Sequence, residues 1–366
     1  MPCSFLKVGL IVAIVFASFS AGLPLSKSNQ IVLADWTSPT LHDLYSVYMI
    51  NASDGWAVGA GGTIIYWNGI QWSNVTSPTV SDLDSVFFVN AQDGWAVGEG
   101  GTIIQWNGTN WNKVPGPTNA NLASVCMVNA DDGWAVGGVG TIIHWNGSNW
   151  VNVTSQVLDD LYSVATANSA DGWAVGASGT MVYWNGTTWT VWYEFPNSET
   201  WLGFNSVCLP SADDGWAVGE LGMIYHWDGS QWTMFSEALD HYLSVFFIDA
   251  DDGWIVGGTG SLIVFGSSGP VYHWNGTKWT FVETPTTSPI ALYSVFMVDA
   301  NDGWIVGEGG TIMCWSGAEW IPEYPQTLWF VLMLGLTLTT VALTKTALKN
   351  RTFSKIRRNC RKYISS

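Results

Sequence analysis

Three histidines, His144, His226 and His273, stand directly before a Trp in three copies of a repeated motif. Imidazole is the commonest metal ligand in proteins, so the pattern raises the hypothesis of a metal site. In other copies Tyr or Gln fills the same place, and equivalent places in successive repeats are a whole repeat apart. We therefore expect partly exposed strand residues, with no metal and no cofactor.

Carboxylates are the second source of candidate chemistry. The stretch "DADDG" at Asp249–Gly253 resembles the start of a calcium loop, but it lacks the later Glu of an EF-hand and matches the turns of the other repeats. A glycosidase needs only two carboxyl groups about 5 to 10 Å apart, and 29 acidic residues leave such a pair open. Most of these acids recur in Asp-Gly turns. We expect no enzyme, with a polysaccharide-active hydrolase as the alternative.

The five cysteines are far apart and show no CxxC spacing, so we expect no disulfide framework. Cys126 and Cys208 follow the same Ser-Val pair in different repeats, which predicts small core residues.

The repeat itself is marked by seven Asp-Gly-Trp triplets. Their Asp residues are separated by 39, 39, 39, 43, 38 and 50 positions, and they are Asp54, Asp93, Asp132, Asp171, Asp214, Asp252 and Asp302. Each unit holds four short segments rich in β-branched and aromatic residues, as in "LYSVYMI", "GWAVG", "TIIYWNG" and "QWSNVT". Gly, Asn, Asp or Pro separates the segments, which is typical of strands joined by tight turns.

Four antiparallel strands per unit of about 40 residues are typical of a propeller blade. The sequence therefore predicts an all-β, seven-bladed β-propeller over residues 31–321. Its repeats lie near residues 41–78, 79–117, 118–156, 157–197, 198–238, 239–286 and 287–321. The segment around Trp36 matches the outer strand around Trp72, so either residues 31–38 or the strand at Trp320 closes the seventh blade.

Tryptophan usage supports a structural role for the repeat. Of 25 Trp residues, 22 occupy three repeated places: after Asp-Gly, before the Asn-Gly type turn, and at the start of the outer segment. Residues repeated in every blade cannot converge on one ligand unless they line the axis. We expect them to pack between blades, each buried ring contributing on the order of 2 to 3 kcal/mol.

The motif L-x-S-V, D-G-W-A-V-G-x-x-G-T-I-I and W-N-G-x-x-W resembles the blades of the photosystem II assembly and stability factor propellers, which belong to the sialidase-like BNR or Asp-box group. The resemblance covers residues 31–321 and implies the propeller fold. The Asp-box turn itself differs, because "WNGIQW" stands where D-G-G-x-T-W is usual. The photosynthetic role of that family is associated with a basic patch, and no Arg precedes Arg351. The resemblance to sialidases implies a site in which three arginines bind a carboxylate. The propeller region has no Arg, so we expect no sialidase activity.

The two ends predict export and anchoring. Residues 1–22 read as a secretory signal peptide, and residues 327–344 as a single transmembrane helix. The tail, 345–366, holds eight of the 12 Lys and Arg, so we expect it in the cytoplasm and the propeller outside the cell. The "PEYP" stretch at 322–325 also resembles an archaeal PEF-type sorting signal, so cleavage and replacement by lipid stays open.

The middle region is strongly acidic. Between residues 28 and 344 only Lys113 and Lys278 are basic, whereas all 29 acidic residues lie there. Such a surface repels phosphate backbones, so we expect no nucleic-acid partner.

Two departures from the repeat predict the binding site. The link at 190–205 is long and aromatic, and the sixth unit carries a nine-residue insertion around "LIVFGSSGP". In a four-stranded blade both links emerge on one face, so we expect a protein or glycan partner there, unless the two links pack on each other as a cap. The candidate binding residues are Trp192, Tyr193, Phe195, Trp201, Phe204 and Phe265.

Several sequons lie in the turns, at Asn74, Asn107, Asn146, Asn185 and Asn275, where glycosylation and simple turn chemistry are alternative explanations. Together these features predict a non-catalytic cell-surface propeller that binds a protein or glycan or acts as an assembly scaffold. The alternatives are a hydrolase and a structural surface-layer component.

Overall fold

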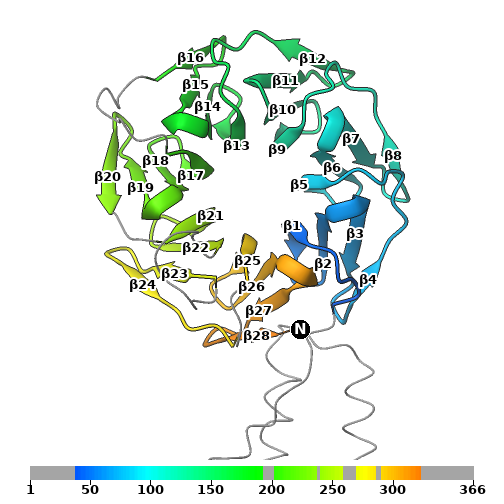
Figure 1. The fold of residues 1–366 in the computed structure, drawn as a ribbon, viewed down its shortest axis with the longest axis vertical. Coiled ribbons are helices and arrows are strands. Elements are labelled where there is room, and N and C mark those ends of the chain that lie inside the picture. Colours follow the sequence, from blue (N-terminus) through cyan, green and yellow to red (C-terminus); the bar gives the residue numbers. More distant parts are fainter. Residues whose placement is uncertain (1–37, 193–201, 237–239, 259–268, 286–289, 323–366) are drawn as a thin grey trace, which may run out of the picture. The chain divides into compact units, whose positions relative to one another are not determined.

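The computed structural model describes residues 38–192, 202–236, 240–258, 269–285 and 290–322. These residues form seven four-stranded sheets, each made of strands consecutive in the chain. The pairs within each sheet are antiparallel, as in the first one. The sheets follow one another around a closed ring (Figure 1). The prediction of an all-β, seven-bladed β-propeller is confirmed.

The innermost strands are β1 (Leu44–Asn51), β5 (Leu83–Asn90), β9 (Leu122–Asn129), β13 (Leu161–Asn168), β17 (Phe204–Ser211), β21 (His241–Asp249) and β25 (Leu292–Asp299). The second strands are β2 (Asp54–Gly59), β6 (Asp93–Gly98), β10 (Asp132–Gly137), β14 (Asp171–Gly176), β18 (Asp214–Gly219), β22 (Asp252–Gly258) and β26 (Asp302–Gly307). The third strands are β3 (Thr63–Trp67), β7 (Thr102–Trp106), β11 (Thr141–Trp145), β15 (Met181–Trp184), β19 (Ile224–Trp227), β23 (Val271–Trp274) and β27 (Ile312–Trp315). The outer strands are β4 (Trp72–Asn74), β8 (Trp111–Lys113), β12 (Trp150–Val153), β16 (Trp189–Val191), β20 (Trp232–Ser236), β24 (Trp279–Phe281) and β28 (Trp320–Pro322). Short 3-10 turns follow five second strands: η1 (Ala60–Gly62), η2 (Glu99–Gly101), η3 (Ala177–Gly179), η4 (Glu220–Gly222) and η5 (Glu308–Gly310).

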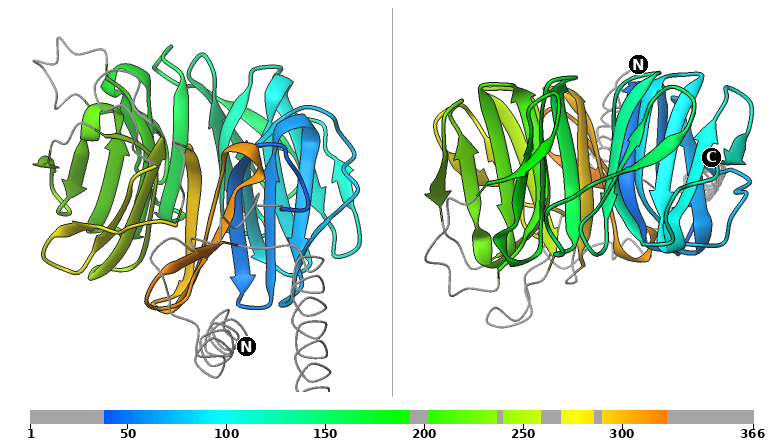
Figure 2. Two further views of the ribbon diagram at one scale, coloured as in Figure 1. Left: turned by 60° about the horizontal axis from the view of Figure 1, so that its bottom comes forward. Right: turned by 90° about the horizontal axis from the view of Figure 1, so that it is seen from above.

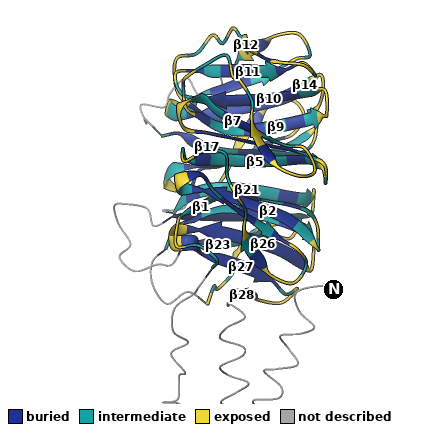
Figure 3. Ribbon diagram, turned by 90° about the vertical axis from the view of Figure 1, so that its right-hand side faces the viewer, coloured by how far each residue is buried: buried dark blue, intermediate teal, exposed yellow. Residues whose placement is uncertain are grey.

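Burial along the strands follows their position in the blade. The second strand is buried at nearly every residue, because strands lie on both its edges and neighbouring blades cover both its faces (Figure 3). The inner strand alternates between buried and half-buried residues, as β1 does. This is the period of two that a pleated strand imposes when one face is fully packed.

Tryptophans pack the interfaces between blades. Trp56 on β2 contacts Trp106 and Trp111 of the next blade, with ring centroids 4.7 and 5.5 Å apart. Trp304 on β26 makes the same contacts with Trp67 and Trp72 of the first blade, at 4.7 and 5.2 Å. The second-strand Trp of every other blade repeats this arrangement. The predicted role of the repeated Trp residues in packing between blades is confirmed.

Serine hydroxyls connect the inner strands around the axis. Ser46 Oγ accepts a hydrogen bond from the Val86 amide of the next blade at 3.2 Å, and Ser294 Oγ accepts from the Val47 amide at 3.3 Å. The other five Ser-Val pairs do the same between their neighbours. The Ser-Val pair is therefore a polar contact between blades, repeated all the way around the ring.

The seventh sheet takes its outer strand from the C-terminal side of the propeller, because β28 pairs with β27. Residues 38–40 belong to the link that enters the first blade: the carbonyl of Thr40 lies against Gly310 of the seventh blade, as the carbonyl of Thr79 in the next link lies against Gly62 of the first blade. Residues 31–37 lie outside the described part of the chain.

Two kinds of link lie on opposite faces of the ring (Figure 2). The hairpin face carries the turns between first and second strands and between third and fourth strands. The loop face carries the turns between second and third strands and the segments that lead from one blade to the next. Gly62 shows how tight the loop face is: its φ is 71°, and a Cβ there would lie 2.3 Å from the Thr79 oxygen.

None of the helices in the described ranges is long and apolar enough to span a membrane. The predicted signal peptide, 1–22, the predicted span, 327–344, and the tail, 345–366, all lie outside those ranges.

Candidate functional site

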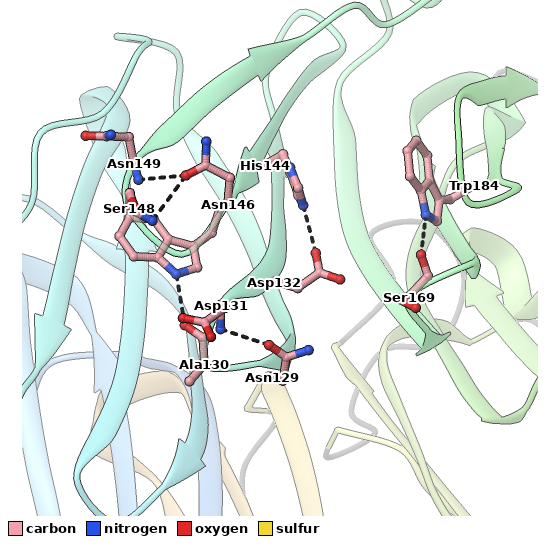
Figure 4. Close-up of polar contacts among 11 residues, drawn as sticks. Asn129, Ala130, Asp131, Asp132, His144, Asn146, Ser148, Asn149, Ser169 and Trp184 are labelled. Atoms are coloured by element: carbon pink, nitrogen blue, oxygen red, sulfur yellow. Dashed lines mark hydrogen bonds and ion pairs between the residues drawn. The ribbon is translucent and has the colours of Figure 1, made fainter.

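The histidines pair with aspartates of their own blade. His144 Nε2 lies 2.7 Å from Asp132 Oδ1 (Figure 4). The His144 ring also stacks on Trp134 at a centroid distance of 4.3 Å. The same pair forms in two further blades, at 2.9 Å each, between His226 and Asp214 and between His273 and Asp252. These histidines are half-buried strand residues, each held inside its own blade.

The acidic turn at 249–253 is also accounted for locally. Asp249 Oδ1 accepts a hydrogen bond from the Asp251 amide at 2.9 Å, and Asp252 is the partner of His273. Across the described ranges, no three His, Cys, Asp or Glu side chains are grouped so that they could hold a metal ion.

The thiols on the inner strands are unsuited to nucleophilic chemistry. Burial raises the pKa of the Cys208 thiol to about 12, and burial raises the pKa of Cys126, whose Sγ lies 3.3 Å from Thr166 Oγ1. A nucleophilic cysteine needs a lowered pKa, because the thiolate is the reactive form. Both residues therefore act as small packing groups, as the sequence predicts.

The inner strands also carry a one-sided set of aromatic rings. Tyr48 lies 4.9 Å from Phe87 and 4.7 Å from Phe296, and Phe296 lies 4.6 Å from Phe246. At the equivalent position the other three blades have small residues, namely Cys126, Ala165 and Cys208. The residue two positions after the repeated Ser marks this place, and the sequence analysis did not single it out.

The predicted aromatic binding site is only partly described. Phe204 is 2% exposed and packs edge-on against Tyr225, with centroids 5.3 Å apart. Trp192 packs against Trp173 and Trp227 at 5.3 and 5.6 Å. Both belong to the packing between the fourth and fifth blades, which corrects the expectation that they form an exposed surface. Tyr193, Phe195, Trp201 and Phe265 lie outside the described residues.

The predicted sequons lie at exposed positions. In the hairpin turns the Asn Oδ1 accepts backbone amides two and three residues on, as Asn146 does from Ser148 and Asn149 (Figure 4). Asn107, Asn185 and Asn275 do the same. Asn74 differs, because its Nδ2 donates to the Pro39 carbonyl at 2.8 Å. Turn chemistry explains the hairpin asparagines, and their glycosylation stays a prediction.

The loop face is built by acidic side chains that join neighbouring blades. Asp82 Oδ1 accepts from the Gly61 amide of the preceding blade at 2.7 Å, while the Asp82 carbonyl accepts from Glu99 of its own blade at 3.0 Å. Asn121 and Asp160 make the same side-chain contact with Gly100 and Val139. The residue before each of the first four inner strands therefore positions two turns at once.

The inner rim of this face is acidic. Burial raises the pKa of Asp84 to about 6, with further increases from the nearby carboxylates of Asp82 and Glu99. Burial and the carboxylates of Asp82, Asp43 and Asp84 raise the pKa of Tyr45. The loop-face segments contain no Lys or Arg: Lys113 ends the outer strand β8, and Lys278 lies in a turn of the hairpin face.

Apolar side chains are exposed on the same face. Leu41, Val80 and Leu158 occupy equivalent places three residues before an inner strand and are 74%, 87% and 83% exposed. Val139 and Leu221, in turns between second and third strands, are 68% and 46% exposed. None of these residues was among the predicted binding residues.

The fold defines a seven-bladed β-propeller. No family model and no curated protein matches the chain. Among solved structures it is similar to YCF48 bound to D1 peptide, with 19% identity, TM-score 0.60, and coverage of 76% of this chain and 92% of that one. YCF48 from Cyanidioschyzon merolae gives 17% identity, TM-score 0.59, and coverage of 76% and 97%. The WD40 β-propeller domain of Doa1 gives 13% identity, TM-score 0.61, and coverage of 76% and 93%.

These similarities confirm at the level of fold the resemblance to photosystem II assembly-factor propellers seen in the sequence motifs. At such identities they show the fold alone.

Proposed function

We propose that this chain is a non-catalytic scaffold that binds a polypeptide partner on its loop face. The observation that carries the proposal is the exposure of Leu41, Val80 and Leu158 among acidic side chains on a face without Lys or Arg. Exposed apolar side chains with a polar surround mark interaction surfaces. That a YCF48 structure contains a bound D1 peptide supports a polypeptide as the class of partner.

We further propose that the propeller is displayed outside the cell and anchored by residues 327–344. The uncharged segment followed by the basic tail supports this orientation. Protease protection of the tail in sealed cells, with access to the propeller, tests the proposal. Cleavage of the tail in intact cells contradicts it.

Site-specific photo-crosslinking tests the binding proposal. A crosslinker placed at Val80 on the loop face of the full chain, in membranes of its own host, should capture discrete polypeptides. The same crosslinker at Ile70 is the matched control, because Ile70 is 73% exposed but lies in a turn of the hairpin face. Equal capture at both positions contradicts a partner on the loop face. If no polypeptide is captured but the chain is specifically retained on a glycan array, the glycan alternative is favoured.

A polysaccharide hydrolase is the second candidate, favoured by one observation. Asp84 has a pKa of about 6 beside Asp82 and Glu99, and a raised carboxyl pKa next to other carboxylates is a property of general acids in glycosidases. Release of reducing sugar by the purified chain, abolished by Asp84→Asn, would establish this function and overturn the non-catalytic proposal.

A further inference from the structure

Four apolar side chains of the third, fourth and fifth blades are exposed on the loop face. Val139, Leu158, Tyr162 and Leu221 are 68%, 83%, 38% and 46% exposed, and we name them the blade-four patch. Val139 and Leu221 come from the turns of the third and fifth blades. Leu158 and Tyr162 come from the segment that enters the fourth blade and from the start of β13.

The members of the patch are linked by the contacts of the loop face. The Val139 amide donates to Asp160 Oδ1 at 2.7 Å, which fixes this turn beside the segment that carries Leu158. The carboxylates of Asp160, Glu220 and Asp159 lie close enough to Tyr162 to raise its pKa, after the larger effect of burial. Glu220 directly precedes Leu221. The acidic groups therefore stand among the apolar ones.

Two members of the patch adopt a backbone conformation that suits glycine. Val139 and Leu221 have φ of 55° and 49°. The equivalent places in the first, second and seventh blades hold Gly61, Gly100 and Gly309, at 62° to 63°. A β-branched or bulky residue at positive φ is a strained outlier. Much of each side chain is exposed to solvent, so burial within this chain offsets only part of the strain.

The charge around the patch selects its occupant. Asp159, Asp160 and Glu220 surround it, and no loop-face segment in the described ranges contributes a Lys or Arg. An acidic surface attracts cations and repels phosphate and carboxylate groups. Exposed Leu and Val side chains gain from burial against apolar groups. A ligand that satisfies both requirements carries apolar side chains next to positive ones.

We propose that the blade-four patch is a docking surface for a cationic, apolar polypeptide segment, in which leucine-like side chains alternate with Lys or Arg. The inference rests on the proposed scaffold function and names the chemistry of its partner. The apolar side chains of the segment cover Val139, Leu158 and Leu221, and its positive charges face Asp159, Asp160 and Glu220.

The test uses the full chain, purified in detergent, and a labelled synthetic peptide in which two leucines are flanked on both sides by lysines. Fluorescence anisotropy measures its dissociation constant. Leu158→Ser should weaken binding about tenfold, since burial of one Leu side chain is worth roughly that much in affinity. Ile70→Ser is the matched control, because Ile70 is 73% exposed but lies in a turn of the hairpin face, outside the patch.

Val139→Gly and Leu221→Gly separate binding from folding. Each removes an apolar side chain and relieves a positive φ, so the melting temperature should not fall while the peptide binds several-fold more weakly. Peptides with glutamate for lysine, or serine for leucine, should both fail to bind. Raising the salt concentration should weaken binding of the lysine peptide, because salt screens the interaction between its charges and the carboxylates of the patch.

The outcomes distinguish the inference from the proposed function. Peptide binding lost in Val80→Ser but kept in Leu158→Ser overturns the inference and leaves a polypeptide-binding loop face intact. Self-association of the chain that Leu158→Ser abolishes, or binding of the glutamate peptide, overturns the inference as well. Crosslinking that is equal on the loop and hairpin faces overturns the scaffold proposal together with it.

Discussion

The amide of Gly309 in the seventh blade donates a 2.7 Å hydrogen bond to Asp43 Oδ1 at the start of the first, 266 residues earlier in the chain. The contact is the one that Asp82 makes with Gly61 between consecutive blades. The contact that joins consecutive blades therefore also joins the last blade to the first.

Removal of the Asp43 carboxylate should weaken the interface between the seventh and first blades. Asp43→Ala leaves the Gly309 amide without its carboxylate, and we expect a loss of roughly 1 to 3 kcal/mol in the free energy of unfolding, as for hydrogen bonds to charged groups. Urea denaturation measures it. Asp82→Ala is the matched control and should cost a similar amount. If Asp43→Ala is neutral while Asp82→Ala is not, the closing contact contributes nothing to stability.

The tryptophan between the last and first blades should contribute as much to stability as its counterparts at the other interfaces. Trp304 is 1% exposed and contacts Trp67 and Trp72. Trp304→Ala should destabilise the protein by about 3 to 5 kcal/mol, because truncating a large buried aromatic leaves a cavity. Trp95→Ala, at an interface between consecutive blades, should match it in a thermal unfolding series. A much smaller effect for Trp304 would show that the closing interface is loosely packed.

Two glycines of the loop face separate steric clash from backbone strain. Gly62 and Gly100 have φ of 71° and 63°, but a Cβ on Gly62 would meet the Thr79 oxygen at 2.3 Å, whereas a Cβ on Gly100 meets nothing within 4 Å. Gly100→Ala should cost about 1 to 2 kcal/mol from its positive φ alone. Gly62→Ala should cost clearly more in the same denaturation experiment. Equal costs would contradict the close approach of Thr79.

Asp84 should make stability depend on pH. Its pKa in the folded protein is about 6, above the ordinary Asp value near 3.9. The folded state therefore favours the protonated form, so the contribution is fully present below about pH 4 and is lost as the pH rises through 6. Asp84→Asn should raise the free energy of unfolding by about 1 to 2 kcal/mol at pH 7 to 8, once solvent screening is allowed for. Parallel pH profiles for the variant and the parent protein, measured by urea titration, would contradict this prediction.

Much of the fold could be predicted because the same sequence pattern occurs seven times. The Asp-Gly-Trp spacing, the turn residues and the Trp positions each indicate four strands per unit and seven units. The candidate site was harder to predict from the sequence. Phe204 looked like part of an aromatic insertion, yet it occupies the place of Leu44 at the start of an inner strand and is buried. Its place in the repeat was a better guide than its chemical type.

The sequence by itself determined the blade, the number of blades and the residues that pack between them, since each depends on contacts within about one repeat length. Only the tertiary structure decided which partners lie far apart in the chain. It placed Asp43 beside Gly309 and connected the Ser-Val pairs into one ring of hydrogen bonds. It also brought Val139, Leu158 and Leu221 to one face. The curvature of the closed ring, which no single repeat contains, sets these distances.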